Sequence, residues 1–169
     1  MALTLQPATL KDASYVMANL NKHDAAEVDC QVAPGTPRHE MGYGLLMAGD
    51  NFAVREDGQP IAFFGTMPIS CCYLQVWALG TKRMWAATAE ISKFMRHEHL
   101  PERIEQGFIG MEARSWVGHP TAHKWISRMG GRAHGPPFEF GRNREKFLLF
   151  RWTPNEIERI RLKRRRPPA

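Results

Sequence analysis

The sequence predicts an α/β domain built on a mixed central sheet of about seven strands, with helices on both faces of the sheet. Two observations predict this class. Short apolar runs with strand-like alternation recur along the chain, and segments with apolar residues at helical spacing separate most of them. Two central runs flank a tight turn, whereas later runs are separated by helices, so the sheet needs both antiparallel and parallel pairs.

The first third of the chain predicts one strand followed by helices. Thr9 offers an N-cap hydroxyl to the first helix, and Asp12 follows three positions later, which is a variant of the capping box. Breakers over 33–40 then separate two further helical segments. In order, we predict a strand over 3–6, an amphipathic helix over 10–22, a short helix over 24–31 and a small-residue helix over 41–49.

The clearest local pattern is a β-hairpin over 51–67. Apolar runs flank Asp57-Gly58, a pair that accepts the left-handed backbone of a tight hairpin turn. Further along, Pro101 is expected to end a long helix. The remaining predicted segments are a strand over 72–79, a helix over 84–99, a strand over 108–113, a helix over 120–129 and a final hairpin over 138–140 and 147–152.

Composition excludes secreted scaffolds and membrane proteins as classes. No apolar run approaches the roughly 20 residues that a membrane span needs, and the first residues lack the basic and apolar segments of a secretory signal. The three cysteines, two of them adjacent, do not form a paired framework and indicate a reducing compartment. We therefore expect neither secretion by a signal peptide nor a membrane partner.

The positive charge of the chain is concentrated near its end. The 169 residues carry a net charge of +6, and 159–169 hold six basic side chains and no acidic one, which leaves the rest neutral. We predict one folded domain over 1–155 and a basic, disordered tail over 156–169. The tail is either a solvated end without a role, a tether for nucleic acid or a docking peptide for a larger assembly.

Three stretches carry a family resemblance that covers about residues 3–152. They are Gln6–Ala13, Trp77–Thr81 and His123–Gly130. With the order of elements, they resemble the Gcn5-related N-acetyltransferase (GNAT) fold, and in detail small phage proteins of that fold such as the internal virion proteins of podovirus-type phages. The resemblance implies an N-acetyltransferase that moves an acetyl group from acetyl-coenzyme A (acetyl-CoA) to a small-molecule or protein amine in a host cytoplasm. Its alternative is a non-catalytic binding module that contacts phage structural proteins in the phage particle.

The resemblance also implies where acetyl-CoA binds. In the family, an Arg/Gln-x-x-Gly-x-Gly/Ala loop after the fourth strand holds the pyrophosphate on backbone N–H groups at a helix start, and two splayed strands, here 72–78 and 107–113, admit the pantetheine arm. This chain has one glycine there, Gly80, and Met84 and Trp85 stand where the family has small residues. The residues implied to contact acetyl-CoA are Val76, Trp77, Ala78, Gly80, Thr81, Lys82, Arg83, Met84 and Trp85.

The catalytic groups that the resemblance implies lie on the segment 119–131. The family's tyrosine, which protonates the leaving thiolate, falls on Ile126, which has no proton to give, and this implies a degraded activity unless another group substitutes. Ser127 is the candidate donor on the same segment, and His119 is the candidate acceptor of the proton from the amine. Other nearby hydroxyl or thiol groups are those of Ser115, Cys71 and Cys72.

Histidine spacing does not predict a metal site. His97 and His99 diverge near a helix end, and His119 with His123 supplies two ligands where zinc needs three or four. Most tryptophans are expected in the core. Trp85 and Trp125 are the exceptions, beside the implied acetyl-CoA groove or at a partner surface.

Overall fold

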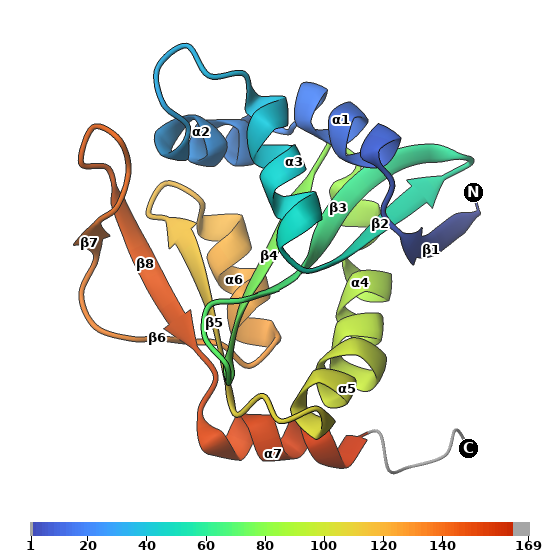
Figure 1. Ribbon diagram of the computed structural model, residues 1–169, viewed down its shortest axis with the longest axis vertical. Helices are drawn as coiled ribbons and strands as arrows, with labels where there is room; N and C mark the ends of the chain where they lie inside the picture. The colour runs from blue at the N-terminus through green and yellow to red at the C-terminus, as the bar shows by residue number, and fades with distance from the viewer. Residues whose placement is uncertain (1, 164–169) are drawn as a thin grey trace.

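The computed structural model describes residues 2–163 (Figure 1). Its strands are β1 (Leu3–Pro7), β2 (Asp50–Glu56), β3 (Gln59–Pro68), β4 (Tyr73–Gly80), β5 (Gly110–Trp116), β6 (Arg132–Ala133), β7 (Phe138–Glu139) and β8 (Lys146–Arg151). Its helices are α1 (Leu10–Ala18), α2 (Lys22–Gln31), α3 (Arg38–Ala48), α4 (Thr88–Phe94), α5 (Leu100–Glu105), α6 (Pro120–Arg128) and α7 (Pro154–Lys163), with a 3-10 turn η1 (Met84–Ala86) and a π-helical turn η2 (Met95–His99).

The strands form a single mixed sheet. Their order is β1-β2-β3-β4-β5-β8, and β6 and β7 are successive fragments that both pair with β8. Eight strands therefore fill seven positions, with β4 and β5 paired in parallel and the other neighbours antiparallel. The predicted mixed sheet of about seven strands is confirmed.

The central hairpin forms as predicted, with β2 and β3 as its arms. Asp57 and Gly58 have φ angles of 48° and 86°, the left-handed values that a two-residue hairpin turn requires. Glycine adopts such values without steric cost, and aspartate is among the side chains that tolerate them best. The turn pair sets the register of the strand pairs next to it, and an irregularity between Val54 and Arg55 shifts the register beyond them.

The first predicted helix is shorter than the sequence indicates. The capping box of Thr9 and Asp12 is present at its start, but the helix ends at Ala18 instead of residue 22. Leu20 forms an isolated bridge with Thr81 across the sheet, so the chain becomes extended before α2 begins. Long-range pairing thus overrides the helical spacing at this point.

Pro101 does not end the helix over 84–99, and that prediction is wrong. The chain continues through α4, η2 and α5, with Pro101 in the first turn of α5. Proline has no N–H to bond back into the preceding turn, and a π-helical turn is a known way to accommodate such a defect. The helical arm therefore extends to Glu105.

The predicted boundary at 155/156 does not hold for the described residues, because α7 runs to Lys163. Ile157 and Ile160 are buried in the same core cluster as Leu100, and α7 packs against α5. The sequence prediction followed the many charged residues near the chain end and overlooked these two isoleucines. They are three positions apart and therefore lie on one face of a helix. The rest of the predicted tail, 164–169, lies outside the described residues.

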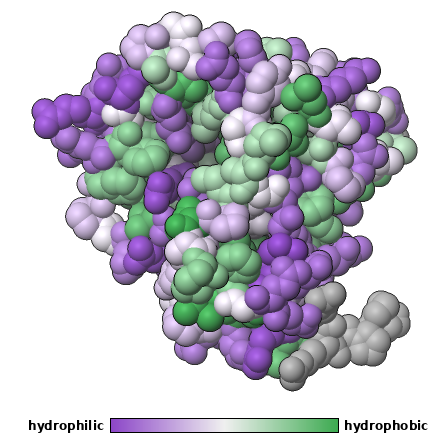
Figure 2. Space-filling view, in the orientation of Figure 1, coloured by the Kyte–Doolittle hydropathy of each residue, from purple (hydrophilic) through white to green (hydrophobic). Residues whose placement is uncertain are grey.

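Two adjacent phenylalanines of β3 mark the two faces of the sheet. Phe63 and Phe64 are both buried and point to opposite faces, as neighbours on a strand do. Phe63 packs with α1, α2 and α3, whereas Phe64 packs with α4, α5, α6 and α7, so helices cover both faces. On the side seen in Figure 2, hydrophobic residues form small separate groups among hydrophilic ones. Over residues 2–163 no helix has the length and apolar character to cross a membrane.

Candidate active site

Strands β4 and β5 lie together at one end and separate toward the other. They pair in parallel over 73–75 and 110–112, and their ladder ends there. Beyond that point β4 continues to Gly80 along β3, and β5 continues to Trp116 along β8. The two strands therefore enclose a V-shaped gap, as expected for splayed strands (Figure 1).

The edge of β4 that faces the gap carries backbone donors. The N–H of Gly80 bonds to Asp24 and its carbonyl accepts the N–H of Asn21, so both groups of Gly80 point away from β3. Backbone groups alternate between the two edges of an antiparallel strand. The N–H and C=O groups of Ala78 and Val76 therefore point to the same edge, into the gap.

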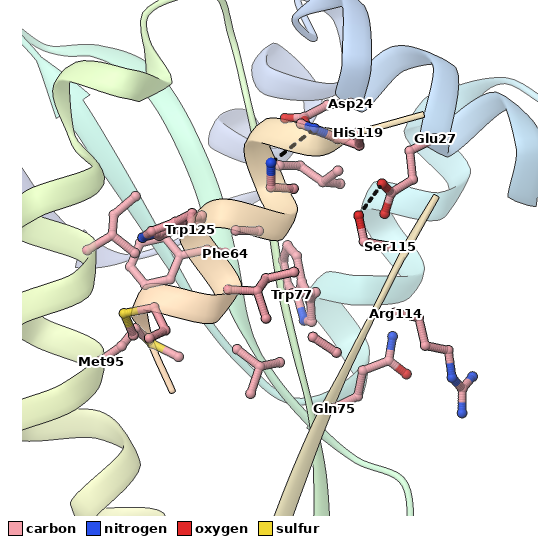
Figure 3. A pocket seen from close by; sticks show the side chains of 18 of the residues that line it. Asp24, Glu27, Phe64, Gln75, Trp77, Met95, Arg114, Ser115, His119 and Trp125 are labelled. Carbon is pink, nitrogen blue, oxygen red and sulfur yellow. Dashed lines mark hydrogen bonds and ion pairs between the residues drawn. The ribbon is translucent and has the colours of Figure 1, made fainter. Parts of the chain in front are cut away.

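Helix α2 crosses the open end of the gap and is fixed to both strands. Asp24 accepts the N–H of Gly80, at the end of β4, at 2.6 Å. One turn later, Glu27 accepts the hydroxyl of Ser115 and the N–H of Trp116, on β5, each at 3.0 Å (Figure 3). Two carboxylates of one helix therefore bridge the strands where the sheet itself does not.

A pocket of about 110 Å³ passes through this gap from one face of the sheet to the other. Leu45 and Leu79 line it on the α2–α3 side, and Phe64 and Ile91 line it on the α4–α6 side. Figure 3 shows Glu27 to one side of the pocket and Phe64 to the other. The charged and polar side chains that line the pocket are Asp24, Glu27, Gln31, Gln75, Arg114, Ser115 and His119.

Glu27 is the ionisable group that the pocket alters most clearly. Burial raises the pKa of Glu27 from an ordinary value of 4.5 to about 7, against the opposing effect of the bonds from Trp116 and Ser115. Both donors bond to Oε2, and no described residue donates to Oε1. Glu27 therefore offers a carboxylate oxygen that exchanges a proton near neutral pH.

His119 is buried, and both of its ring nitrogens are engaged. Nδ1 accepts the N–H of Ala122 and so caps α6, while Nε2 lies 2.7 Å from Asp24 Oδ1. Since Nδ1 accepts, Nε2 carries the hydrogen and donates it to Asp24. A second proton on Nδ1 would displace the helix cap. This geometry does not fit the predicted role of His119 as acceptor of the amine proton and makes it a positioning residue.

Helix α6 presents one face to the pocket, and Ser127 is not on it. Ala122, Trp125, Ile126 and Met129 line the pocket, whereas Ser127 is exposed and does not. Ser127 therefore lacks the contact that the predicted role of proton donor requires. Ile126 does lie in the pocket, where the resemblance places the family's tyrosine.

Most amides of the anion-binding loop predicted at Gly80 are already bonded within the protein. The N–H of Gly80 bonds to a carboxylate, that of Asp24, and a phosphate beside this group would be repelled. The N–H groups of Thr81 and Arg83 are bonded within the protein, and the guanidinium of Arg83 pairs with Glu56. The charge of Arg83 is thus compensated before any ligand binds, whereas Lys82 is exposed.

The residues predicted to contact acetyl-CoA divide into two groups. Five of them line the pocket: Val76, Trp77, Ala78, Met84 and Trp85. The other four do not: Gly80, Thr81, Lys82 and Arg83. The structure therefore brings the β4 residues and the last two loop residues to the pocket and leaves Gly80–Arg83 outside it.

A tryptophan of α6 spans the pocket on its apolar side. Trp125 Nε1 donates to the hydroxyl of Ser92, on α4, at 2.8 Å, and that hydroxyl donates to the carbonyl of Thr88 at 2.6 Å. This bridge joins α4 to α6 across the pocket wall. Trp85, which was also predicted to contact acetyl-CoA, lines the pocket and is 37% exposed.

Sequence reasoning missed the two carboxylates that define the site. Asp24 and Glu27 lie on the predicted helix 24–31, and neither was predicted as a site residue. A signal existed: Asp24, Glu27 and Val28 recur at helical spacing, and Val28 is fully buried. Acidic residues on the same face as a core residue indicate buried carboxylates.

Comparison with known proteins identifies the fold. No family model matches the chain, and no curated protein matches it. An N-acetyltransferase from Staphylococcus aureus Mu50 superposes with a TM-score of 0.67 at 12% identity, covering 92% of this chain and 99% of that one. Spermidine N-acetyltransferase from Vibrio cholerae, in complex with CoA and spermine, gives 0.65 at 14%, covering 92% and 98%. The chain therefore has the fold of the GNAT acetyltransferases, as predicted.

Proposed function

We propose that this protein transfers an acetyl group from acetyl-CoA to a primary amine, with Glu27 as the general base. The observation that supports this most is the position of Glu27. A carboxyl group with a pKa of about 7 lines a pocket that crosses the sheet between two separated strands. A base is most effective when its pKa lies near the working pH.

The gap fits the thioester end of acetyl-CoA. The N–H of Ala78 would donate to the thioester carbonyl, where negative charge develops as the amine attacks. The pantetheine arm would leave along the apolar side of the pocket, past Ile91 and Trp125. The phosphates would then lie outside the pocket near the exposed Lys82, instead of in the predicted loop at Gly80.

The reaction balances with one protein base. The amine nitrogen bonds to the carbonyl carbon, the C–S bond breaks, and the sulfur leaves with the electron pair. The attacking amine is neutral, and Glu27 Oε1 takes the proton that the amine nitrogen must lose once the bond to the carbonyl carbon has formed. Because a thiol has an ordinary pKa of about 8.5, a carboxylic acid of pKa about 7 can return that proton to the thiolate. The missing tyrosine therefore does not by itself require a degraded activity.

The experiment is calorimetric titration with acetyl-CoA, followed by measurement of thiol release with a panel of primary amines. We expect binding, and a kcat for Glu27→Gln that is lower by about 10²-fold or more, as for loss of a general base. Glu40→Gln is the matched control, since Glu40 is an exposed glutamate on the neighbouring helix α3. Equal turnover by Glu27→Gln and Glu40→Gln would remove Glu27 from the mechanism.

The same titration decides the second function, a binding module of a phage particle. Absence of acetyl-CoA binding and of turnover would favour it. The basic segment that would dock it begins in α7, where Arg159 and Arg161 pair with Glu156 and Glu158 of the same helix. Nucleic-acid or assembly docking by this segment stays a prediction, and its test is the retention of the full chain on DNA at increasing salt.

A further inference from the structure

The pocket contains a hydrogen-bond donor that the protein leaves unused. Trp77 Nε1 is buried, lines the pocket through its side chain, and has no partner among the described residues. A buried N–H without an acceptor costs about 1–3 kcal/mol. Such a group in a pocket wall indicates a bound molecule that supplies the acceptor. Gln75, two positions earlier on the same strand face, adds a side-chain amide to this wall.

The same part of the pocket borders a group of three charged residues with a net positive charge. Glu112, the register partner of Gln75, is buried and accepts bonds from Arg114 at 2.9 Å and from Arg151 at 3.4 Å. One carboxylate between two guanidinium groups leaves a net charge of about +1 on the three residues. Arg114 is the member of this group that lines the pocket.

The two ends of this side of the pocket therefore differ in charge. Glu27 lies at the open end of the gap, and Gln75 belongs to the last paired position of the two strands, at the closed end (Figure 3). Between them, Met41 and Leu45 of α3 supply an apolar wall. A polyamine would need an acidic group at each end, whereas this site is acidic at one end and donor-rich at the other.

From this arrangement we propose that the acceptor is an α-amino acid with an apolar side chain. Its amine would lie at Glu27, and its carboxylate would accept the N–H of Trp77 and the donors of Gln75 and Arg114. Its side chain would pack on the α3 wall. The inference rests on the proposed acetyl transfer for its chemistry, but the binding site for the carboxylate does not depend on that activity.

The test uses two probes that differ only in the carboxylate, L-leucine and 3-methylbutylamine, with L-leucinamide and spermidine as comparisons. Binding to the full chain is measured by calorimetry, and acetylation by thiol release. We expect L-leucine to be bound and used at least about tenfold better than 3-methylbutylamine, as for a hydrogen-bonded charge.

Three variants separate recognition from structure. Trp77→Phe keeps the ring and removes the N–H, and Arg114→Gln removes the charge. Each should raise KM for L-leucine by about tenfold, and this rise should be larger than any change in the KM for 3-methylbutylamine. Arg114→Lys should recover part of the loss. Arg144→Gln, at a guanidinium with 82% exposure outside the pocket, is the matched control.

Each outcome is decisive. Binding of L-leucine that Trp77→Phe weakens, without any turnover, supports the inference and overturns the proposed acetyl transfer. Turnover in which 3-methylbutylamine, L-leucinamide or spermidine equals or exceeds L-leucine overturns the inference and leaves acetyl transfer standing. A chain that neither binds nor acetylates any of the four probes contradicts both.

Discussion

Glu27→Gln should change how the stability of the protein depends on pH. In the unfolded chain Glu27 has an ordinary pKa of 4.5, and in the folded protein burial raises it to about 7. Between these values the folded state holds a proton that the unfolded state has released, so unfolding becomes easier as pH rises. The contribution is complete below pH 4.5 and is lost above pH 7. Glutamine has no such proton, so the variant lacks this dependence.

The magnitude follows from the two pKa values. One pKa unit corresponds to about 1.4 kcal/mol, so the interval from 4.5 to about 7 sets an upper bound of about 3 kcal/mol. Because the side chain is only half-buried, solvent screening reduces the expected effect to about 1–2 kcal/mol. The amide oxygen of glutamine can still accept the bonds from Ser115 and Trp116, which limits other losses.

Urea unfolding followed by tryptophan fluorescence measures this difference, at pH 4.5 and at pH 8. The free energy of unfolding of Glu27→Gln minus that of the unsubstituted chain should be about 1–2 kcal/mol higher at pH 8 than at pH 4.5, so the variant gains stability relative to the unsubstituted chain as pH rises. His99, whose pKa burial lowers to about 4, is present in both proteins, so its titration cancels. If the two proteins differ in free energy of unfolding by the same amount at pH 4.5 and at pH 8, Glu27 ionises as it does in water. The argument that Glu27 is a base near neutral pH would then fail.

Two further predictions concern the bridge across the pocket and the last helix. Ser92→Ala leaves the N–H of Trp125 without its acceptor, so we expect the free energy of unfolding, measured in urea, to fall by about 1–3 kcal/mol. We also expect a lower Kd for acetyl-CoA, because the hydrogen bond between α4 and α6 no longer resists the separation of these helices. An unchanged Kd for acetyl-CoA would show that acetyl-CoA does not pass between α4 and α6. Ile160→Ala should cost about 2–4 kcal/mol, whereas Leu162→Ala, which is 47% exposed, should cost little. Equal effects would place α7 outside the core.

The elements that the sequence predicts well are those decided by neighbouring residues. The turn at Asp57-Gly58 and the capping box at Thr9 each depend on contacts within a few positions, and both form as predicted. The end of the first helix at Ala18 was missed, because the pairing of Leu20 with Thr81 decides it from far along the chain.

The site was less predictable because distant segments assemble it. Asp24 bonds to Gly80 and to His119, which are 56 and 95 positions away. The sequences of β4 and β5 do not indicate that the two strands separate, since apolar and polar residues alternate along a strand in the same way whether or not its neighbour is paired. The family resemblance predicted the splayed strands. It also predicted a phosphate-binding loop at Gly80, where the N–H is instead bonded to the carboxylate of Asp24.

The short fragments β6 and β7 have a consequence for association between molecules. A sheet edge with a long row of free backbone groups can recruit a strand from another chain. Here one edge is divided by a segment that contains Pro136 and Pro137, and the opposite edge is the five-residue β1, which ends at Pro7. Proline removes backbone donors from an edge. Neither border offers a foreign strand a long continuous template, which protects the folded chain against polymerisation through its sheet.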